Sequence, residues 1–133
     1  MIKGQYEVPD IKNASIFTLV KSILDNYLKG ENIKLLGISG AGGAGKTTFA
    51  DNLTKFLGKE NSIAVDLDDY LISRGERSRL EITGYNPRAN KLSLARFNLE
   101  DLKKNKIVKK PRYDHSTGNV LPEEELNPNR III

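Results

Sequence analysis

The sequence has no cysteine, no tryptophan and only one histidine among its 133 residues. Without cysteine the chain can form neither disulfide bonds nor thiolate metal sites, and a single histidine excludes a zinc site built from several histidines. No stretch approaches the ~20 apolar residues that a membrane-spanning helix needs. The beginning of the sequence has no apolar run typical of a secretory signal. We therefore expect a cytoplasmic protein that has no membrane partner.

The residues that are present suffice for a folded core, since 38% are hydrophobic and 29% are charged. The formal net charge is +4, and residues 74–112 hold twelve Lys or Arg against four Asp or Glu. Such a basic segment can bind nucleic acid or an anionic small molecule. It lacks the aromatic interleaving of single-strand binding proteins, so nucleic acid is not the expected partner. Five lysines of this segment are interpreted as a solvated helix face: Lys103, Lys104, Lys106, Lys109 and Lys110.

The spacing of apolar residues predicts alternating helices and strands. Helical spacing predicts three helices: residues 14–29, 46–57 and 93–104. Short apolar runs predict three buried strands: residues 33–39, residues 62–67 and the start of a strand at 130–133. Strands that alternate with helices indicate an α/β fold with a parallel sheet.

The remaining segments are more polar. Residues 72–90 are rich in Arg, Gly, Asn and Pro, and they are predicted to form a loop or short irregular helices. Two short strands, at 107–108 and around 120–121, are predicted to be joined by a connection over residues 111–119.

A glycine-rich phosphate-binding motif lies between the first strand and the second helix: Gly40-Ala41-Gly42-Gly43-Ala44-Gly45-Lys46-Thr47. It fits the pattern G-x-x-x-x-G-K-[ST] in the strand-then-helix context that the pattern requires. Glycines let successive N–H groups face one phosphate, and the helix start adds the positive end of its dipole. Lys46 can reach the β- and γ-phosphates, and the Thr47 hydroxyl can ligate Mg²⁺. These eight residues and Thr48 are therefore predicted to bind a nucleoside triphosphate; the alternative is a glycine-rich turn without a ligand.

Three carboxylates follow the second predicted strand: Asp66, Asp68 and Asp69. Ligands of open α/β sheets bind beyond the carboxyl ends of the strands. An acid at this position can therefore lie near the γ-phosphate and accept the proton of an attacking hydroxyl. The alternative, for one or two of the three, is a solvated turn or a helix N-cap. The base-reading N-K-x-D motif of GTPases does not occur in this sequence.

The order of four motifs makes the sequence similar to one family. The P-loop is followed by Asp68-Asp69-Tyr70, then Asn86-Pro87-Arg88-Ala89, then Pro111-Arg112-Tyr113-Asp114. Over about residues 33–133 the sequence resembles the phosphoribulokinase/uridine kinase family of P-loop kinases. The resemblance implies a three-layer P-loop nucleoside triphosphate hydrolase fold, incomplete at the C-terminus. It also implies transfer of the γ-phosphate of ATP, with Mg²⁺, to a hydroxyl of a sugar, nucleoside or related metabolite.

The resemblance also implies a division of the chain. We expect a single kinase-like domain over residues 1–133, in which the helix 14–29 precedes the other parts. A nucleotide-binding core over residues 33–70 and an acceptor-binding insertion over about 71–128 are expected to follow. Residues 129–133 would begin the central strand.

By position, the resemblance gives roles to individual residues. Asp68 matches the general base that also anchors the acceptor, and it joins Lys46 in the expected catalytic pair. Tyr113 matches a tyrosine that packs on the acceptor. The residues expected to bind the acceptor are Asp68, Tyr70, Arg74, Arg88, Tyr113 and His115.

Two departures from uridine kinases bear on the acceptor. Arg88 stands where those enzymes carry a ribose-binding acid, and Gly118 stands where they carry a histidine that reads pyrimidines. Uridine and cytidine are therefore not the expected acceptors. Four arginines would suit an acceptor that already bears a phosphate or carboxylate: Arg74, Arg77, Arg79 and Arg88. The alternatives are that these arginines are solvent-exposed or help hold ATP, and that His115 is a loop residue without contact to the acceptor.

Three functions therefore stay open. The leading one is a small-molecule kinase, the second is a nucleotide-binding fragment without catalytic activity, and the third is an ATPase coupled to nucleic acid. The sequence ends in the apolar run 131–133, where the resembling kinases continue with an acidic residue, a glycine and an arginine-bearing lid. We expect an N-terminal piece with weak or absent kinase activity on its own, and its oligomeric state stays open.

Overall fold

The computed structural model of the chain describes residues 18, 20–22, 25 and 32–133. Of the predicted helix 14–29, the described residues are helical, and the others lie outside the described part. The chain divides into two compact units. Unit 1 comprises Met1–Val65 and Pro128–Ile133, and unit 2 comprises Asp66–Asn127. The acidic turn after Val65 thus packs within unit 2, whereas the sequence placed it with the nucleotide-binding core.

Unit 1 contains a parallel sheet of three short strands: β1 (Lys34–Leu35), β5 (Ile131–Ile132) and β2 (Ser62–Ile63), in the order β1-β5-β2. In register, Lys34 and Ser62 both lie opposite Ile131. The backbone hydrogen bonds between the parallel segments continue beyond the regular strands: Val65 N donates to Ile133 O over 2.7 Å. The three predicted strands and the parallel α/β arrangement are confirmed, and the regular ladders are shorter than predicted.

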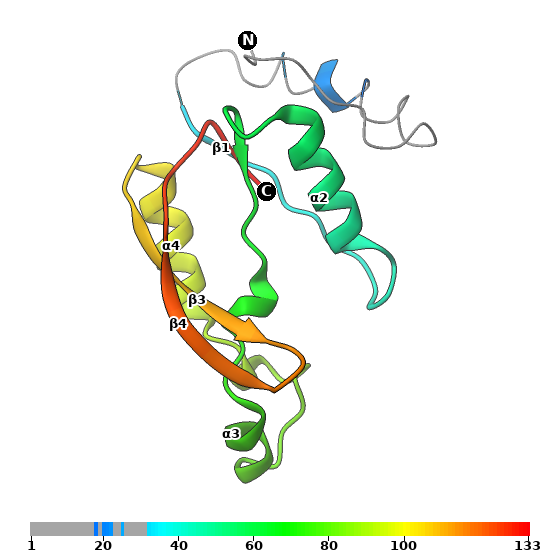
Figure 1. Cartoon of the computed structure of the whole chain (residues 1–133), viewed down its shortest axis with the longest axis vertical. Coiled ribbons are helices and arrows are strands. Elements are labelled where there is room, and N and C mark those ends of the chain that lie inside the picture. Colours follow the sequence, from blue (N-terminus) through cyan, green and yellow to red (C-terminus); the bar gives the residue numbers. More distant parts are fainter. Residues whose placement is uncertain (1–17, 19, 23–24, 26–31) are drawn as a thin grey trace. The chain divides into compact units, whose positions relative to one another are not determined.

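Helix α2 (Lys46–Leu57) has the bounds that the sequence predicted (Figure 1). It ends at Gly58, whose φ of 88° favours glycine and whose N–H donates to Thr54 O over 2.9 Å. Leu53, Phe56 and Leu57 form its buried face, and they pack with Ile131 of the central strand. Burying each of these side chains contributes about 1.5–3 kcal/mol. The phosphate-binding motif is thus followed directly by a helix that is fixed in the core of unit 1.

Unit 2 contains short helices and a hairpin, with these bounds: η2 (Leu67–Tyr70), α3 (Arg74–Arg79), η3 (Pro87–Ala89), α4 (Leu92–Lys103), β3 (Val108–Asp114) and β4 (Asn119–Leu126). The two short helices α3 and η3 confirm the prediction for residues 72–90. The predicted helix 93–104 is confirmed one residue earlier, as α4. No described helix is long and apolar enough to span a bilayer.

The hairpin corrects the prediction of two short strands. Strands β3 and β4 pair antiparallel from Val108–Leu126 to Asp114–Asn119, so residues 111–114 of the predicted connection 111–119 belong to β3 and Asn119 belongs to β4. Pro111 is tolerated because the register shifts between Lys110 and Arg112, where the ladder does not require its missing N–H. The long strands were missed because β4 is exposed along nearly its whole length and shows no alternation of apolar and polar residues.

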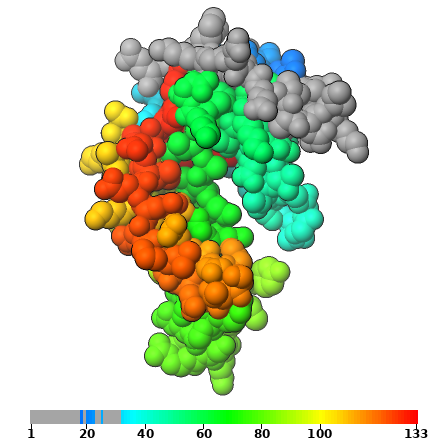
Figure 2. All heavy atoms as spheres, in the orientation of Figure 1, coloured from blue at the N-terminus to red at the C-terminus, as the bar shows by residue number. Residues whose placement is uncertain are grey.

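The tip of the hairpin is tightly hydrogen-bonded. Asp114 Oδ1 accepts from Ser116 Oγ over 2.6 Å and from Ser116 N over 2.9 Å. The hydroxyl and then the backbone N–H of Ser116, followed by Thr117, lower the pKa of Asp114 to about 2. Gly118 N donates to Asp114 O over 2.7 Å, and Gly118 O accepts from Arg74 N over 2.8 Å. The tip is therefore connected to the first residue of α3, and the space-filling view shows the orange tip lying against the green segment that contains α3 (Figure 2).

Replacing Gly118 with alanine should destabilise unit 2. Gly118 has a φ of 74°, and an added Cβ would lie 2.7 Å from Arg74 Cβ. Backbone strain and this overlap together should lower the free energy of unfolding by about 1–3 kcal/mol. Gly75→Ala is the matched control, because an added Cβ there meets nothing within 4 Å and alanine favours a helix. Chemical denaturation measures both variants, and equal stability of the two would contradict the prediction.

Candidate functional site

The P-loop of unit 1 has the backbone geometry that binding of a phosphate requires. Gly43 and Gly45 have φ values of 76° and 94°, a region that favours glycine, and a Cβ added at either would meet nothing within 4 Å. Gly45 is the N-cap of α2, and neither a capping side chain nor an acid occupies the first turn. The first N–H groups of a helix lack intrahelical partners. This helix start can therefore bind an anion.

The side chain of Lys46 folds back onto the P-loop that precedes it. Its Nζ donates to Gly40 O over 2.7 Å and to Ala41 O over 3.0 Å. A phosphate oxygen carries more negative charge than a carbonyl oxygen, so the ammonium group can exchange these two bonds for bonds to phosphates. Thr47 and Thr48 are exposed at the helix start. The predicted nucleotide-binding residues thus form one continuous surface segment of unit 1.

The donor set of the P-loop fits Mg²⁺ bound together with a nucleotide. Within the described part of the chain, no group of three or more His, Asp or Glu residues could hold a metal by itself. Mg²⁺ typically takes few protein ligands and completes its shell with waters and substrate phosphates. The exposed Thr47 hydroxyl, next to the anion-binding helix start, is suited to serve as such a ligand.

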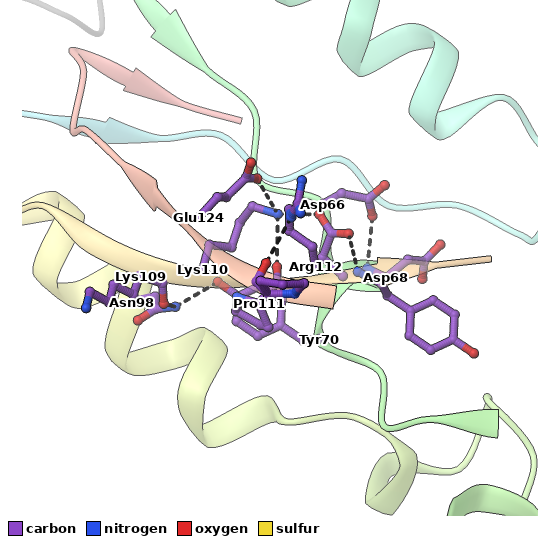
Figure 3. Close-up of polar contacts among 12 residues, drawn as sticks. Asp66, Asp68, Tyr70, Asn98, Lys109, Lys110, Pro111, Arg112 and Glu124 are labelled. Carbon is purple, nitrogen blue, oxygen red and sulfur yellow. Dashed lines mark hydrogen bonds and ion pairs between the residues drawn. The ribbon is translucent and has the colours of Figure 1, made fainter. Parts of the chain in front are cut away.

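In unit 2 the three carboxylates of the acidic turn have different surroundings (Figure 3). Asp66 is the N-cap of η2, and its Oδ1 accepts from Asp68 N over 2.9 Å. Asp69 uses both oxygens, since Oδ1 accepts from Tyr113 N over 3.2 Å and Oδ2 pairs with Lys110 Nζ. Asp68 is exposed, and its carboxylate forms no hydrogen bond or ion pair with any described residue. Asp68 is therefore the one of the three whose two carboxylate oxygens are both without a partner among the described residues.

Tyr70 lies in the core of unit 2 and not at the surface. Its side chain is 1% exposed, and its hydroxyl accepts from Asn98 Nδ2 over 3.0 Å. Burial raises the pKa of Tyr70, against the smaller opposing effect of the Asn98 hydrogen bond. This position does not support the expected contact between Tyr70 and an acceptor. It makes Tyr70 an anchor between η2 and α4.

Lys110 is a functional candidate that the sequence did not identify. The sequence predicted a solvated helix face that includes Lys110, but Lys110 lies on strand β3 and is only 4% exposed, so the prediction is wrong for this residue. Lys106 and Lys109 are exposed as predicted but also lie outside the helix α4. Lys110 Nζ pairs with Asp69 and, over 3.2 Å, with Glu124 Oε1. Burial alone would lower the pKa of Lys110, but the Asp69 and Glu124 carboxylates outweigh that effect and raise it. The available signal was strand alternation, which places Lys110 on the same face as the apolar Val108.

Tyr113 and His115 lie together with an arginine of α3. Arg77 Nη2 donates to Tyr113 Oη over 3.0 Å, and its guanidinium lies 5.5 Å from the centre of the Tyr113 ring. The exposed His115 ring meets the Tyr113 ring edge to face, with centroids 4.9 Å apart. Tyr113 itself is only 7% exposed. His115 is thus the member of this aromatic pair that is accessible to a ligand.

The four arginines of the predicted anion site divide into two pairs. Arg77 bonds to Tyr113 and to Ile72 O, and Arg74 Nη2 donates to His115 O over 3.1 Å. These two join α3 to the rest of unit 2. The side chains of Arg79 and Arg88 are exposed and make no hydrogen bond or ion pair with the residues that the structure describes. They are therefore the arginines that remain available for an anionic ligand.

Comparison with known proteins identifies the family. Residues 35–133 match the family model of "Phosphoribulokinase / Uridine kinase family". A phosphoribulokinase of Synechocystis sp. is 35% identical over 104 residues, which cover 77% of this chain and 31% of that protein. A uridine kinase of Ureaplasma parvum is 37% identical over 87 residues, which cover 62% of this chain and 42% of that protein.

A solved structure shows the same fold. The structure of a possible uridine kinase from Bacillus stearothermophilus is similar with a TM-score of 0.75 and 22% identity, over 92% of this chain and 70% of that one. The chain thus spans about a third of the length of the Synechocystis relative, and its architecture is that of a P-loop kinase in partial form. The match of the family model over most of the described residues shows that this chain belongs to the phosphoribulokinase/uridine kinase family.

Proposed function

We propose that the protein is an ATP-dependent kinase that transfers the γ-phosphate of ATP to a hydroxyl of a sugar, nucleoside or related metabolite. The observation that carries the proposal is the isolation of Asp68. Its exposed carboxylate makes no bond to a described residue, whereas Asp66 caps η2 and Asp69 is held in an ion pair. A carboxylate without competing donors is available as a general base.

The P-loop supplies the binding of the nucleotide. Backbone N–H groups of residues 40–48 hold the phosphates at the start of α2. Lys46 exchanges the carbonyls of Gly40 and Ala41 for the β- and γ-phosphates. The Thr47 hydroxyl would hold Mg²⁺, which would supply positive charge to the phosphate oxygens. Lys46 is thus expected to stabilise the transferred group as well as to bind ATP.

Asp68 supplies the proton transfer. The acceptor oxygen forms a bond to the γ-phosphorus while the bond from that phosphorus to the bridging β–γ oxygen breaks, and the bridging oxygen keeps the electron pair as part of ADP. The hydroxyl proton passes to the Asp68 carboxylate. In this reaction Asp68 must come within hydrogen-bonding distance of the acceptor hydroxyl, about 2.6–3.2 Å.

The acceptor is expected to carry an anionic group. Arg79 and Arg88 are exposed and available, and guanidinium groups bind phosphate or carboxylate bidentately. His115 adds an exposed ring beside Tyr113 on which the acceptor can pack. These three residues support a metabolite that already bears a phosphate or carboxylate in preference to a neutral nucleoside.

A second candidate function is binding of a nucleotide without transfer by these residues. The division of the chain favours it, because the P-loop belongs to unit 1 while Asp68 and the exposed arginines belong to unit 2. Unit 1 has its own core around Leu53 and Ile131. It can therefore bind ATP whether or not unit 2 presents an acceptor.

Thermal-shift measurements with a non-hydrolysable ATP analogue and a panel of acceptors distinguish the two functions. A true acceptor should add to the stabilisation by the analogue, since a ligand at 100 times its Kd stabilises by about 2.7 kcal/mol. We expect anionic acceptors to stabilise the protein and their neutral counterparts to have little effect. The variant Arg88→Ala should reduce this difference in stabilisation between anionic and neutral acceptors. ATP consumption is measured with each acceptor in parallel. Nucleotide binding with no transfer to any acceptor would support the second function and contradict the first.

A further inference from the structure

We infer that Lys110 is a positioning residue for Asp68: by holding Asp69 in a buried ion pair, it fixes the η2 turn that presents the Asp68 carboxylate. The inference rests on the proposed function, in which Asp68 accepts the proton. Lys110 itself touches no reacting atom in this account. It acts through Asp69 on the orientation of the neighbouring residue.

The backbone around Asp68 is held by its neighbours and not by its own side chain. Asp68 N donates to Asp66 Oδ1 over 2.9 Å, and Asp69 N donates to Asp66 O over 3.2 Å. Leu71 N donates to Asp68 O over 3.4 Å and closes the turn. A four-residue turn of this kind makes few bonds of its own. The direction of the Asp68 side chain therefore depends on what holds the turn to the rest of unit 2.

Asp69 provides that connection to strand β3. One oxygen accepts from Tyr113 N over 3.2 Å, and the other pairs with Lys110 Nζ. Both partners lie on β3, so the Asp69 carboxylate bridges two points of one strand (Figure 3). Tyr70 adds a second attachment, to Asn98 of α4. The turn is thus attached to the rest of unit 2 at residues 69 and 70, directly after Asp68.

Lys110 is built into the structure as a buried cation. Its ammonium group bonds to Asp69, to Glu124 Oε1 over 3.2 Å and to Pro111 O over 3.2 Å, which uses its three donors. Its side chain is 5% exposed, whereas that of Glu124 is 46% exposed. Glu124 therefore contacts solvent, and the partly buried Asp69 depends on Lys110 for neutralisation. Without Lys110 the Asp69 charge would favour a move toward water and would repel the carboxylate of Asp68.

Steady-state kinetics on the full chain, with MgATP and the acceptor of the panel that is phosphorylated fastest, test the inference. Lys110→Met should lower kcat about 10–100-fold, because displacement of a reacting group by about 1 Å can cost that much, while the KM for ATP stays unchanged. The double variant Lys110→Met/Asp69→Asn should recover most of this loss, since asparagine removes the uncompensated charge and can still accept from Tyr113 N. Lys109→Met is the matched control, because Lys109 is exposed on the same strand.

The outcomes separate this inference from the proposed function. A folded Lys110→Met variant with the kcat of the unaltered protein would overturn the inference alone, and so would a double variant that is no better than the single one. If Lys110→Met does not fold, Asp69→Ala decides, because alanine removes both contacts of residue 69 to β3: a loss of kcat at constant KM for ATP supports the inference, and an unchanged kcat contradicts it. Undiminished transfer by Asp68→Asn would instead remove the proposed role of Asp68, and the inference with it.

Discussion

Replacing Asp68 with asparagine should lower kcat by about 10²–10⁴-fold and leave the affinity for MgATP nearly unchanged. The amide has almost the shape of the carboxylate but cannot accept the hydroxyl proton. The Asp68 side chain makes no bond to other residues of the described chain, so its loss should cost little stability. Transfer rates are measured with a saturating acceptor, and ATP affinity is measured by calorimetry.

Asp66→Asn is the control for this prediction. It is the same chemical change two residues earlier, and the amide oxygen can still accept the bond from Asp68 N. We expect its kcat to stay within a few-fold of the unaltered protein, with at most a small loss of stability from the weaker cap. Equal losses in the two variants would mean that the charge of the whole turn matters and that Asp68 has no special role.

Replacing Lys46 with alanine should weaken ATP binding by about 10–100-fold, as expected for the loss of charge-assisted hydrogen bonds. The effect on transfer should be larger, because the ammonium group also stabilises charge that develops on the γ-phosphate. The stability of the protein without nucleotide should change little, since the bonds to Gly40 O and Ala41 O are exposed. Calorimetric titration with MgATP measures the first effect, and single-turnover kinetics measure the second.

Lys55→Ala provides the comparison within the same helix. Lys55 lies exposed in the last turn of α2, away from the P-loop along the chain. The substitution Lys55→Ala removes the same charge and the same type of side chain as Lys46→Ala. Any general effect of net charge on nucleotide affinity will therefore appear in both variants. ATP affinities that agree within about threefold between Lys46→Ala and Lys55→Ala would contradict the assignment of Lys46 to the phosphates.

Helix α2 was predictable because a glycine marks each of its two ends. Helix α2 begins after Gly45 and ends at Gly58, and these glycines adopt the positive φ values that make them good boundaries. The hairpin was less predictable, because β4 carries Glu123, Glu124 and Glu125 in succession and so lacks the alternation of apolar and polar residues that is typical of a strand. In addition, Pro111 is a residue typical of loops, although it lies within β3 where the register of the ladder shifts.

The candidate site shows the same limit. The place of Asp68 after the second strand follows from the topology of α/β sheets, and the P-loop follows from its spacing. Which of the three neighbouring carboxylates would be free could not be predicted, because that depends on Lys110 and on Tyr113 N, more than forty residues away. Lys110 was misread because in sequence it ends a run of exposed lysines, and its alternation with the buried Val108 was overlooked.

Unit 2 is inserted between two strands that pair directly, since Ser62 and Ile63 of β2 lie opposite Ile131 and Ile132 of β5. The chain leaves the sheet after one strand and returns to its neighbour. Insertion at such a point lets a segment change length or sequence without altering any strand of the sheet. In the function that we propose, recognition of the acceptor can therefore diversify within residues 66–127 while the P-loop and the core behind it stay constant. This separation offers a physical route by which one family can include proteins named for substrates as different as a phosphorylated pentose and a nucleoside.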